Sequence, residues 1–212
     1  MIYRFLSFAK WKWYHYKDNW LDRKYGINTS GNVRLSELQI SSENICYGVH
    51  YEPVQIHIFQ NIIKYLPNDR INFKFIDLGS GKGRAVILAA LAGYKHCVGV
   101  DFATDLCVIA QKNKDIMNGI ISPNTKIEIY CHDATEYIFP SEDIVIFLYN
   151  PFGEVVLRKV LSNINILHND EHKIYIVYRN PVCADVFRRE EWLEEIFRSE
   201  DFCIYTKHNN RG

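Results

Sequence analysis

The chain has 212 residues, of which 48% are hydrophobic, so it is long enough to bury one complete core. Lysine and arginine together number 25, as do aspartate and glutamate, and the formal net charge is zero. Because nucleic-acid-binding domains usually carry a basic surplus, this balance disfavours a nucleic-acid partner. No apolar run reaches membrane-spanning length, and the six cysteines lack metal-ligand or redox-motif spacing. We therefore expect one cytoplasmic domain without a metal site.

The first 25 residues are rich in tryptophan and tyrosine and carry a surplus of four positive charges. Their apolar residues recur every three or four positions, which predicts an amphipathic helix that ends at Gly26. This helix could pack on the domain, lie on an anionic membrane surface, or contact an acidic or nucleic substrate. We favour packing, because aromatic stripes at helical spacing usually face a core.

Residues 26–50 are polar and turn-rich, which predicts a loop. Pro53 then opens a second predicted helix, which stops at Pro67. The predicted organisation is an N-terminal helical and loop extension over residues 1–50, followed by one domain over residues 51–212.

From residue 72 onwards, short apolar runs alternate with helical patterns, which is typical of a parallel sheet. The final two runs are separated by only three residues, and a link that short requires an antiparallel hairpin. We therefore predict an α/β fold with a Rossmann-like, doubly wound, mostly parallel seven-stranded sheet and an antiparallel C-terminal hairpin. The predicted strands are 73–78, 97–100, 127–130, 144–149, 174–178, 192–198 and 202–208, and the predicted helices between them are 84–91, 104–117 and 154–167.

A glycine-rich turn joins the first predicted strand to the helix that follows it. Its sequence is Asp77-Leu78-Gly79-Ser80-Gly81-Lys82-Gly83. Glycines at such a turn let the backbone reverse sharply and let a ligand approach main-chain N–H groups. A tight turn without a ligand is the alternative, but the preceding strand and following helix favour a nucleotide or nucleoside site.

A second acidic residue, Asp101, ends the next predicted strand. A carboxylate there can accept hydrogen bonds from both ribose hydroxyls of a nucleoside, or simply favour the start of the next helix. Asp77, directly before the glycines, suits an ammonium group and would repel a phosphate. The two acids therefore favour a nucleoside with an amino-acid tail over a dinucleotide.

Four motifs, in order, resemble those of the class I S-adenosylmethionine-dependent methyltransferases: Asp77–Gly83, Gly99–Asp101, His132–Ala134 and Asn150–Phe152. The terminal hairpin also fits that fold, whose last strand is antiparallel. The form of the glycine loop and the Tyr149–Gly153 stretch look like a small bacterial group that is distantly similar to the non-SET lysine methyltransferases. The resemblance covers about residues 50–208.

This resemblance implies that the cofactor is S-adenosylmethionine and the product S-adenosylhomocysteine. The glycine loop would line the methionine and ribose part, and Asp77 would face the amino group. Asp101 would bind the ribose, Asp133 would accept from the adenine amine, and the Ala134 N–H would reach a ring nitrogen. A surface helix cap is the alternative for Asp133. The implied cofactor-binding residues are Asp77, Gly79, Ser80, Gly81, Gly83, Asp101, Phe102, Asp133, Ala134 and Asn150.

Two further segments supply candidate catalytic residues. Asn150-Pro151-Phe152 resembles a shortened form of the Asn-Pro-Pro-aromatic motif of amino-group methyltransferases, in which the asparagine accepts from the target nitrogen; a strand-ending turn is the alternative. Tyr51-Glu52-Pro53 resembles a segment near the methyl donor in the same group. Either Tyr51 or Glu52 could orient an amine, or Glu52 could favour a helix start.

The predicted reaction is methyl transfer to an amine nitrogen of a protein lysine or a small molecule. Two other classes stay open at this point: a nicotinamide-dependent oxidoreductase on the same sheet, and a catalytically silent cofactor-binding partner subunit. The oxidoreductase would need pyrophosphate contacts and a proton donor, and neither has a clear position in the sequence. The oligomeric state is open.

Overall fold

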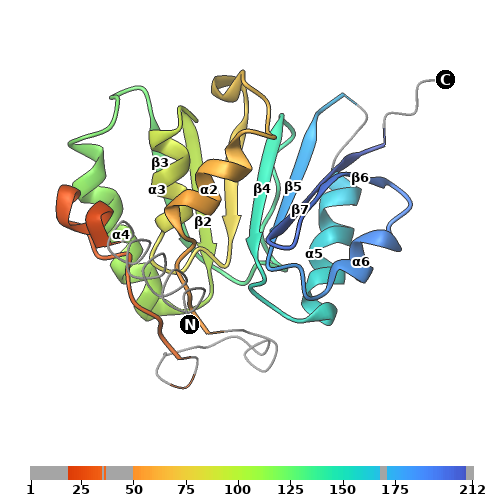
Figure 1. Cartoon of the computed structure of the whole chain (residues 1–212), viewed down its shortest axis with the longest axis horizontal. Helices are drawn as coiled ribbons and strands as arrows, with labels where there is room; N and C mark the ends of the chain where they lie inside the picture. The colour runs from red at the N-terminus through yellow and green to blue at the C-terminus, as the bar shows by residue number, and fades with distance from the viewer. Residues whose placement is uncertain (1–18, 35, 37–49, 168–170, 209–212) are drawn as a thin grey trace, which may run out of the picture.

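The computed structural model describes residues 19–34, 36, 50–167 and 171–208. A seven-stranded sheet with strand order β3-β2-β1-β4-β5-β7-β6 runs through the middle of the molecule (Figure 1). Pairing is parallel from β3 across to β5, and β7 is antiparallel to both of its neighbours. The strands are β1 (Lys74–Leu78), β2 (His96–Asp101), β3 (Lys126–Cys131), β4 (Ile144–Tyr149), β5 (Ile174–Arg179), β6 (Leu193–Arg198) and β7 (Phe202–Lys207). The predicted fold class is confirmed.

The strand order reverses between β1 and β4, which are adjacent although two strands separate them in sequence. In open sheets of this kind, ligands bind at such a reversal, beyond the carboxyl ends of the strands. The register places Leu78 of β1 beside Val100 of β2 and Leu148 of β4. The loops that follow these three strands therefore start at the same edge.

The helices form two layers, with α2 and α3 on one face of the sheet and α5 and α6 on the other (Figure 1). Helix α4 packs mainly on β3, and its Met117 belongs to the core on the α3 side. The helices are α2 (Ile56–Ile63), α3 (Arg84–Leu91), α4 (Thr104–Asn118), α5 (Glu154–Leu167) and α6 (Ala184–Arg188).

Successive residues of the central strands point to opposite faces, and both faces are buried. Phe75 and Phe147 stack on the α3 side with ring centroids 6.1 Å apart. Ile76 and Ile146 belong to the core on the α5 side. Complete burial of such side chains contributes roughly 1.5–3 kcal/mol each, which explains the near-continuous apolar runs in these strands.

Helices α2 and α6 differ most from the prediction. Helix α2 begins at Ile56 rather than Pro53, because Gln55 has an extended backbone (φ −68°, ψ 134°) and occupies the N-cap. Helix α6 was not predicted, since its five residues are too few to show a helical repeat. The predicted ranges of α3, α5 and β4 are confirmed.

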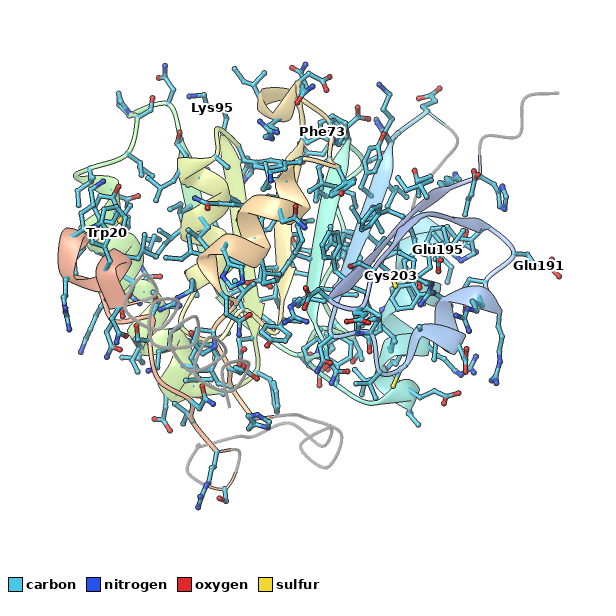
Figure 2. The ribbon with its side chains drawn as sticks, in the orientation of Figure 1. Trp20, Phe73, Lys95, Glu191, Glu195 and Cys203 are labelled. Carbon is cyan, nitrogen blue, oxygen red and sulfur yellow. The ribbon has the colours of Figure 1, made fainter. Side chains whose placement is uncertain are left out.

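The described part of the N-terminal segment packs on the domain. Residues 19–25 are helical, and Gly26 follows them with φ +70°. Leu21 and Ile27 are buried in the core on the α3 side, whereas Trp20 is 48% exposed at one edge of the molecule (Figure 2). These contacts support the packing interpretation for residues 19–25. The remainder of the predicted first helix, residues 1–18, lies outside the described residues.

Candidate functional site

The glycine loop lies at the sheet edge where the strand order reverses. Gly79, Gly81 and Gly83 have φ angles of +78°, +53° and +83°, a left-handed region that favours glycine. The N–H groups of Gly79 and Ser80 donate to the Val100 carbonyl at 2.8 and 3.1 Å. The loop is thereby tied to the end of β2.

Close contacts leave no room for a side chain at Gly79 or at Gly81. A Cβ atom on Gly79 would lie 2.3 Å from the Cβ atom of Pro151, and one on Gly81 would lie 2.1 Å from the Tyr51 ring. Pro151 follows β4, and Tyr51 precedes α2. The fold therefore brings together three segments that were predicted separately as site segments.

The first hollow at this edge lies beside Asp101, on the β3 and α5 side. The space within it, part of which is open to solvent, is about 370 Å³. Its walls are largely apolar, with two carboxylates. The lining residues are Gly79, Val100, Asp101, Phe102, His132, Asp133, Ala134, Pro151, Phe152 and Val156. Seven of the predicted site residues are among them.

Two further hollows adjoin the first at Gly79. One is lined by His50, Tyr51, Glu52, Asp101 and Tyr149, among others. The other extends beneath Tyr51 and Glu52 to Asp77, Ser80 and Arg84. Among the described residues, no lysine or arginine lines the first two hollows, and Arg84 is the one such residue in the third. This lining does not suit a diphosphate.

Asp77 is a buried carboxyl group that no described residue supplies with a hydrogen bond. Its side chain is 3% exposed at the end of β1. Burial, and then the charge of Asp101, raise the pKa of Asp77 well above its ordinary value. A buried carboxyl group without a partner is unfavourable, and such a group in a cleft is typical of a ligand site. A cationic group is the ligand that would relieve this cost.

Asp101 is held by the backbone on both carboxylate oxygens. Oδ2 accepts the Gly81 N–H at 2.7 Å, and Oδ1 accepts the Ala103 N–H at 2.9 Å. Burial raises the pKa of Asp101, and these N–H bonds oppose that rise. Each carboxylate oxygen has a second lone pair, so Asp101 can accept further hydrogen bonds from the hollow that it lines.

Asp133 serves two roles in the described structure. Its Oδ1 accepts the Thr135 N–H at 2.8 Å and the Thr135 hydroxyl at 2.7 Å, which caps the turn after β3. It also lines the first hollow beside Ala134. The turn-capping alternative therefore describes one contact of this side chain without excluding the ligand role.

The side chain of Asn150 has a hydrogen-bond partner within the protein. Its φ of +40° turns the chain sharply after β4, and its Oδ1 accepts the Tyr178 hydroxyl at 2.9 Å. Asn150 does not line any of the three hollows, whereas Pro151 and Phe152 do. This arrangement favours the turn interpretation, and a direct role of Asn150 stays a prediction.

Tyr51 and Glu52 both line the second and third hollows, but they have different partners. The Tyr51 hydroxyl donates to the Thr29 carbonyl at 2.8 Å, and the ring covers Gly81. Glu52 lines the second hollow together with Tyr149, which was not among the predicted catalytic residues. Burial, followed by the charge of Glu52, raises the pKa of Tyr149 to about 12. Of the two candidates, Glu52 is thus the one available to a substrate.

Arg84 is the other residue that sequence reasoning missed. It is 2% exposed at the start of α3 and lines the hollow that contains Asp77. The seven residues that follow it in the helix are all apolar. A charged residue that begins such a buried helix was the available signal, because a buried guanidinium needs polar partners.

Neither a candidate metal site nor a candidate membrane-spanning helix is present among the described residues. No group of three or more His, Cys, Asp or Glu side chains is placed to hold a metal ion. No helix there is long and apolar enough to cross a membrane.

The fold and the acid-lined hollows at the strand reversal define a class I S-adenosylmethionine-dependent methyltransferase. The profile of the family described as "Histone methylation protein DOT1" matches residues 34–144, more than half of the chain. The chain belongs to this family, and its cofactor is S-adenosylmethionine. This membership decides against the oxidoreductase and the silent subunit. A search of curated proteins found no match.

Solved structures share the fold at low sequence identity. A "putative RNA methyltransferase" from Pyrococcus horikoshii superposes with a TM-score of 0.59 at 17% identity, covering 84% of this chain and 94% of its own. An RNA methyltransferase from Salinibacter ruber with S-adenosylhomocysteine has a TM-score of 0.53 at 22% identity, covering 74% and 92%. Magnesium protoporphyrin IX methyltransferase from Synechocystis with bound SAM has a TM-score of 0.54 at 11% identity, covering 72% and 79%.

Proposed function

We propose that this methyltransferase acts on an amine nitrogen, in a protein lysine or a small molecule. The observation that carries the proposal is that Glu52 and Tyr149 line the same hollow, which adjoins the first hollow at Gly79. A carboxylate in this position suits a group that presents N–H donors. It does not suit a carboxylate acceptor, because like charges would repel.

Tyr149 and Glu52 would have different roles toward an incoming amine. Tyr149 keeps its proton because its pKa is raised to about 12, so it can act as a hydrogen-bond donor in this hollow but not as a base. Gln55 Nε2 lies 3.4 Å from Glu52 Oε1 and helps to hold the carboxylate. Glu52 can then accept an N–H of the incoming amine and direct the nitrogen lone pair toward the crevice. Such positioning supplies much of the rate in a displacement reaction.

The cofactor, when bound, supplies an electrophilic methyl group on a good leaving group. The lining residues fit its parts. The apolar walls formed by Ala134, Phe152 and Val156, with Asp133 at the side, suit an adenine ring. Asp101, which the first two hollows share, suits the ribose hydroxyls. Phe102 lines both of these hollows and would pack beside the ribose.

The third hollow fits the amino-acid end of the cofactor. Asp77 and Arg84 both line it, so it offers a negative and a positive group to a zwitterion. The Asp77 carboxylate would bind the ammonium group, and the Arg84 guanidinium would attract the carboxylate. Ser80 lines the same hollow, and Gly79 lets the tail approach the backbone.

The comparisons favour a protein acceptor without fixing it. The family description refers to histone methylation, whereas the titles of the similar structures refer to RNA and to a porphyrin. The neutral overall charge gives no support for a nucleic-acid acceptor. A lysine amine is therefore the acceptor that we place first.

A Glu52→Gln variant tests the amine assignment. We expect the rate of methyl transfer to fall by about 100-fold, the lower end of the effect of a positioned acid or base, because an amide attracts an N–H donor less strongly. The affinity for S-adenosylhomocysteine should stay unchanged. Isotopically labelled donor, cell extract and mass spectrometry would identify the product and give the rate. Glu136→Gln, a change at an exposed acid after β3, is the matched control.

Two outcomes would contradict the proposal. One is label found only on RNA or on carboxyl groups. The other is a Glu52→Gln rate equal to that of the control.

Asp77 predicts a distinctive dependence on pH. Because its pKa is raised in the folded protein, the folded state binds the proton more tightly than the unfolded state does. Its contribution to the stability of the ligand-free protein is complete below about pH 3.9, the unfolded value, and is lost as pH rises toward the folded pKa. The affinity for S-adenosylhomocysteine should rise over the same range, since the ammonium needs the carboxylate.

Urea unfolding and calorimetric titration between pH 5 and pH 9 would measure both trends. The difference between wild type and Asp77→Asn isolates this group from the other acids. Parallel pH profiles of stability for the two proteins would refute the assignment.

We also propose that the chain divides into an extension over residues 1–50 and a domain over residues 51–212. We propose a cytoplasmic location as well. The cysteines at 97, 107, 131, 183 and 203 are free thiols, which supports a reducing compartment.

A further inference from the structure

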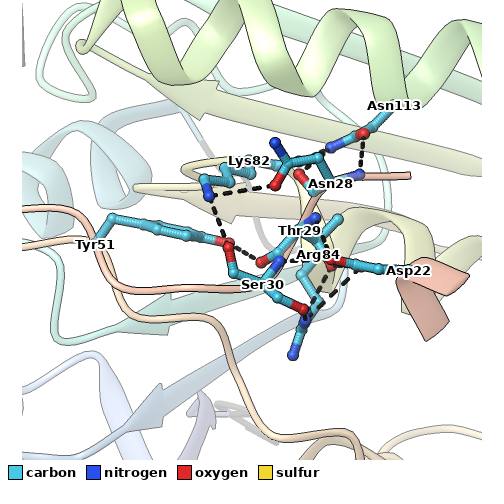
Figure 3. A network of polar contacts seen from close by, with 8 residues as sticks. All are labelled: Asp22, Asn28, Thr29, Ser30, Tyr51, Lys82, Arg84 and Asn113. Carbon is cyan, nitrogen blue, oxygen red and sulfur yellow. Dashed lines mark hydrogen bonds and ion pairs between the residues drawn. The ribbon is translucent and has the colours of Figure 1, made fainter. Parts of the chain in front are cut away.

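A short segment before the matched family region lies across the glycine loop. We call residues 28–30 (Asn28, Thr29 and Ser30) the strap. The Ser30 carbonyl accepts from Lys82 Nζ at 2.7 Å. The Asn28 backbone pairs in both directions with the Asn113 side chain of α4, at 2.8 Å each. Figure 3 shows the strap between these side chains and Arg84.

Thr29 is the centre of this network. It is fully buried, and its hydroxyl accepts from Arg84 Nε at 2.8 Å and donates to Asp22 Oδ1 at 2.5 Å. Its N–H donates to Asp22 Oδ2 at 2.8 Å. Its carbonyl accepts the Tyr51 hydroxyl at 2.8 Å. Every polar atom of Thr29 therefore has a hydrogen-bond partner. Two of these partners, Tyr51 and Arg84, line the third hollow.

The first connection runs through Tyr51. The ring of Tyr51 occupies the space that a side chain on Gly81 would need. The Gly81 N–H in turn donates to Asp101 at 2.7 Å. The Thr29 carbonyl thus fixes the Tyr51 ring, which packs against Gly81. The Gly81 N–H is in turn the donor to Asp101, the acid that we predict to bind the ribose.

The second connection runs through Arg84. The strap supplies acceptors for Nε, from Thr29, and for Nη2, from the Ser30 hydroxyl at 2.8 Å. Asp22 Oδ1 lies 3.8 Å from Nη2 and balances part of the buried charge. A guanidinium is planar, so two fixed nitrogens determine its orientation in the hollow with Asp77.

We infer that the strap is a positioning element of the cofactor site, and that Thr29 is its key positioning residue. This inference rests on the proposed binding of the cofactor's amino-acid end beside Asp77 and Arg84. Residues 28–30 do not line any of the three hollows described above, and they precede residue 34, where the family match begins. The cofactor site therefore depends on residues of the N-terminal extension as well as on the domain.

A Thr29→Val variant tests the inference, because valine keeps the shape and removes the hydroxyl. We expect the Kd for S-adenosylhomocysteine, measured by calorimetry, to rise about tenfold, the change that corresponds to roughly one lost hydrogen bond. Thr29→Ser keeps the hydroxyl and should restore the Kd to within about twofold of wild type. Ser30→Ala removes one acceptor of Arg84 and should weaken binding in the same direction, by a smaller factor.

A control separates positioning from general destabilisation. Ile174 is fully buried at the start of β5, the end of the sheet away from the crevice. Ile174→Val should lower the melting temperature and leave the Kd unchanged. Unchanged affinity in both Thr29→Val and Ser30→Ala, or an equal loss in Ile174→Val, would overturn the role of the strap. A wild-type protein that fails to bind S-adenosylhomocysteine would overturn the cofactor assignment as well, so the two failures are distinguishable.

Discussion

Asp77→Asn is expected to weaken S-adenosylhomocysteine binding by at least about 100-fold. A hydrogen bond to a charged group contributes roughly 1.5–3 kcal/mol, and a buried charged pair loses about 3–5 kcal/mol when one partner is removed. A loss of about 2.7 kcal/mol corresponds to a factor of 100. Asparagine has nearly the same shape, so the loss would report charge rather than packing.

The same substitution should stabilise the ligand-free protein above neutral pH. Asp77 is 3% exposed without a hydrogen bond from the described residues, and asparagine is not forced to lose a proton or to bury a charge. Calorimetry gives the affinity and thermal unfolding gives the stability. Asp69→Asn, at an exposed residue near the opposite end of β1, is the control and should change neither. Tight binding by Asp77→Asn would refute the ammonium assignment.

Gly81→Ala should impair both stability and cofactor binding. The new Cβ atom would lie 2.1 Å from the Tyr51 ring, and the residue has a φ of +53°. The left-handed backbone alone costs an ordinary residue about 1–2 kcal/mol. Displacing the Tyr51 ring adds to this cost and disturbs the Gly81 N–H that Asp101 accepts. We expect a total loss of roughly 3 kcal/mol in unfolding free energy and at least a tenfold loss of affinity.

The Gly31→Ala variant shows how much of the stability lost in Gly81→Ala comes from the left-handed backbone and how much from the clash with the Tyr51 ring. Gly31 has a φ of +80°, and no atom lies within 4 Å of its missing Cβ position. We expect Gly31→Ala to lose only the roughly 1–2 kcal/mol that the left-handed backbone costs, and to bind S-adenosylhomocysteine with unchanged affinity. Introducing Gly81→Ala into a Tyr51→Ala background removes the obstacle, so the second mutation should then cost no more than Gly31→Ala does. Equal effects of Gly81→Ala with and without the ring would show that the contact is not tight.

Most of the fold could be predicted from the sequence, because the hydrophobic periodicities of strands and helices are local patterns. The apolar run that became β4 and the helix that begins at Arg84 were predicted with their observed bounds. The strand reversal between β1 and β4 follows from the resemblance to a known fold rather than from local pattern. Helix α6 was missed because five residues do not establish a period.

The candidate site was predictable where short motifs directly follow neighbouring parallel strands. The glycine loop and Asp101 lie together as expected. Contacts between distant segments were not predictable: Thr29 and Arg84 are 55 positions apart in sequence and share a buried hydrogen bond. The hydrogen bond between Asn150 and Tyr178, which lies on the neighbouring strand β5, was likewise not predictable from the local sequence.

The most direct test of the proposed cofactor and acceptor sites is a crystal structure of the protein with S-adenosylhomocysteine. We expect the amino group to contact the Asp77 carboxylate, the ribose to contact Asp101, and the sulfur to face the hollow that Glu52 and Tyr149 line. A complex in which the amino-acid end points away from Asp77, or in which the sulfur is closed off from Glu52, would contradict these assignments.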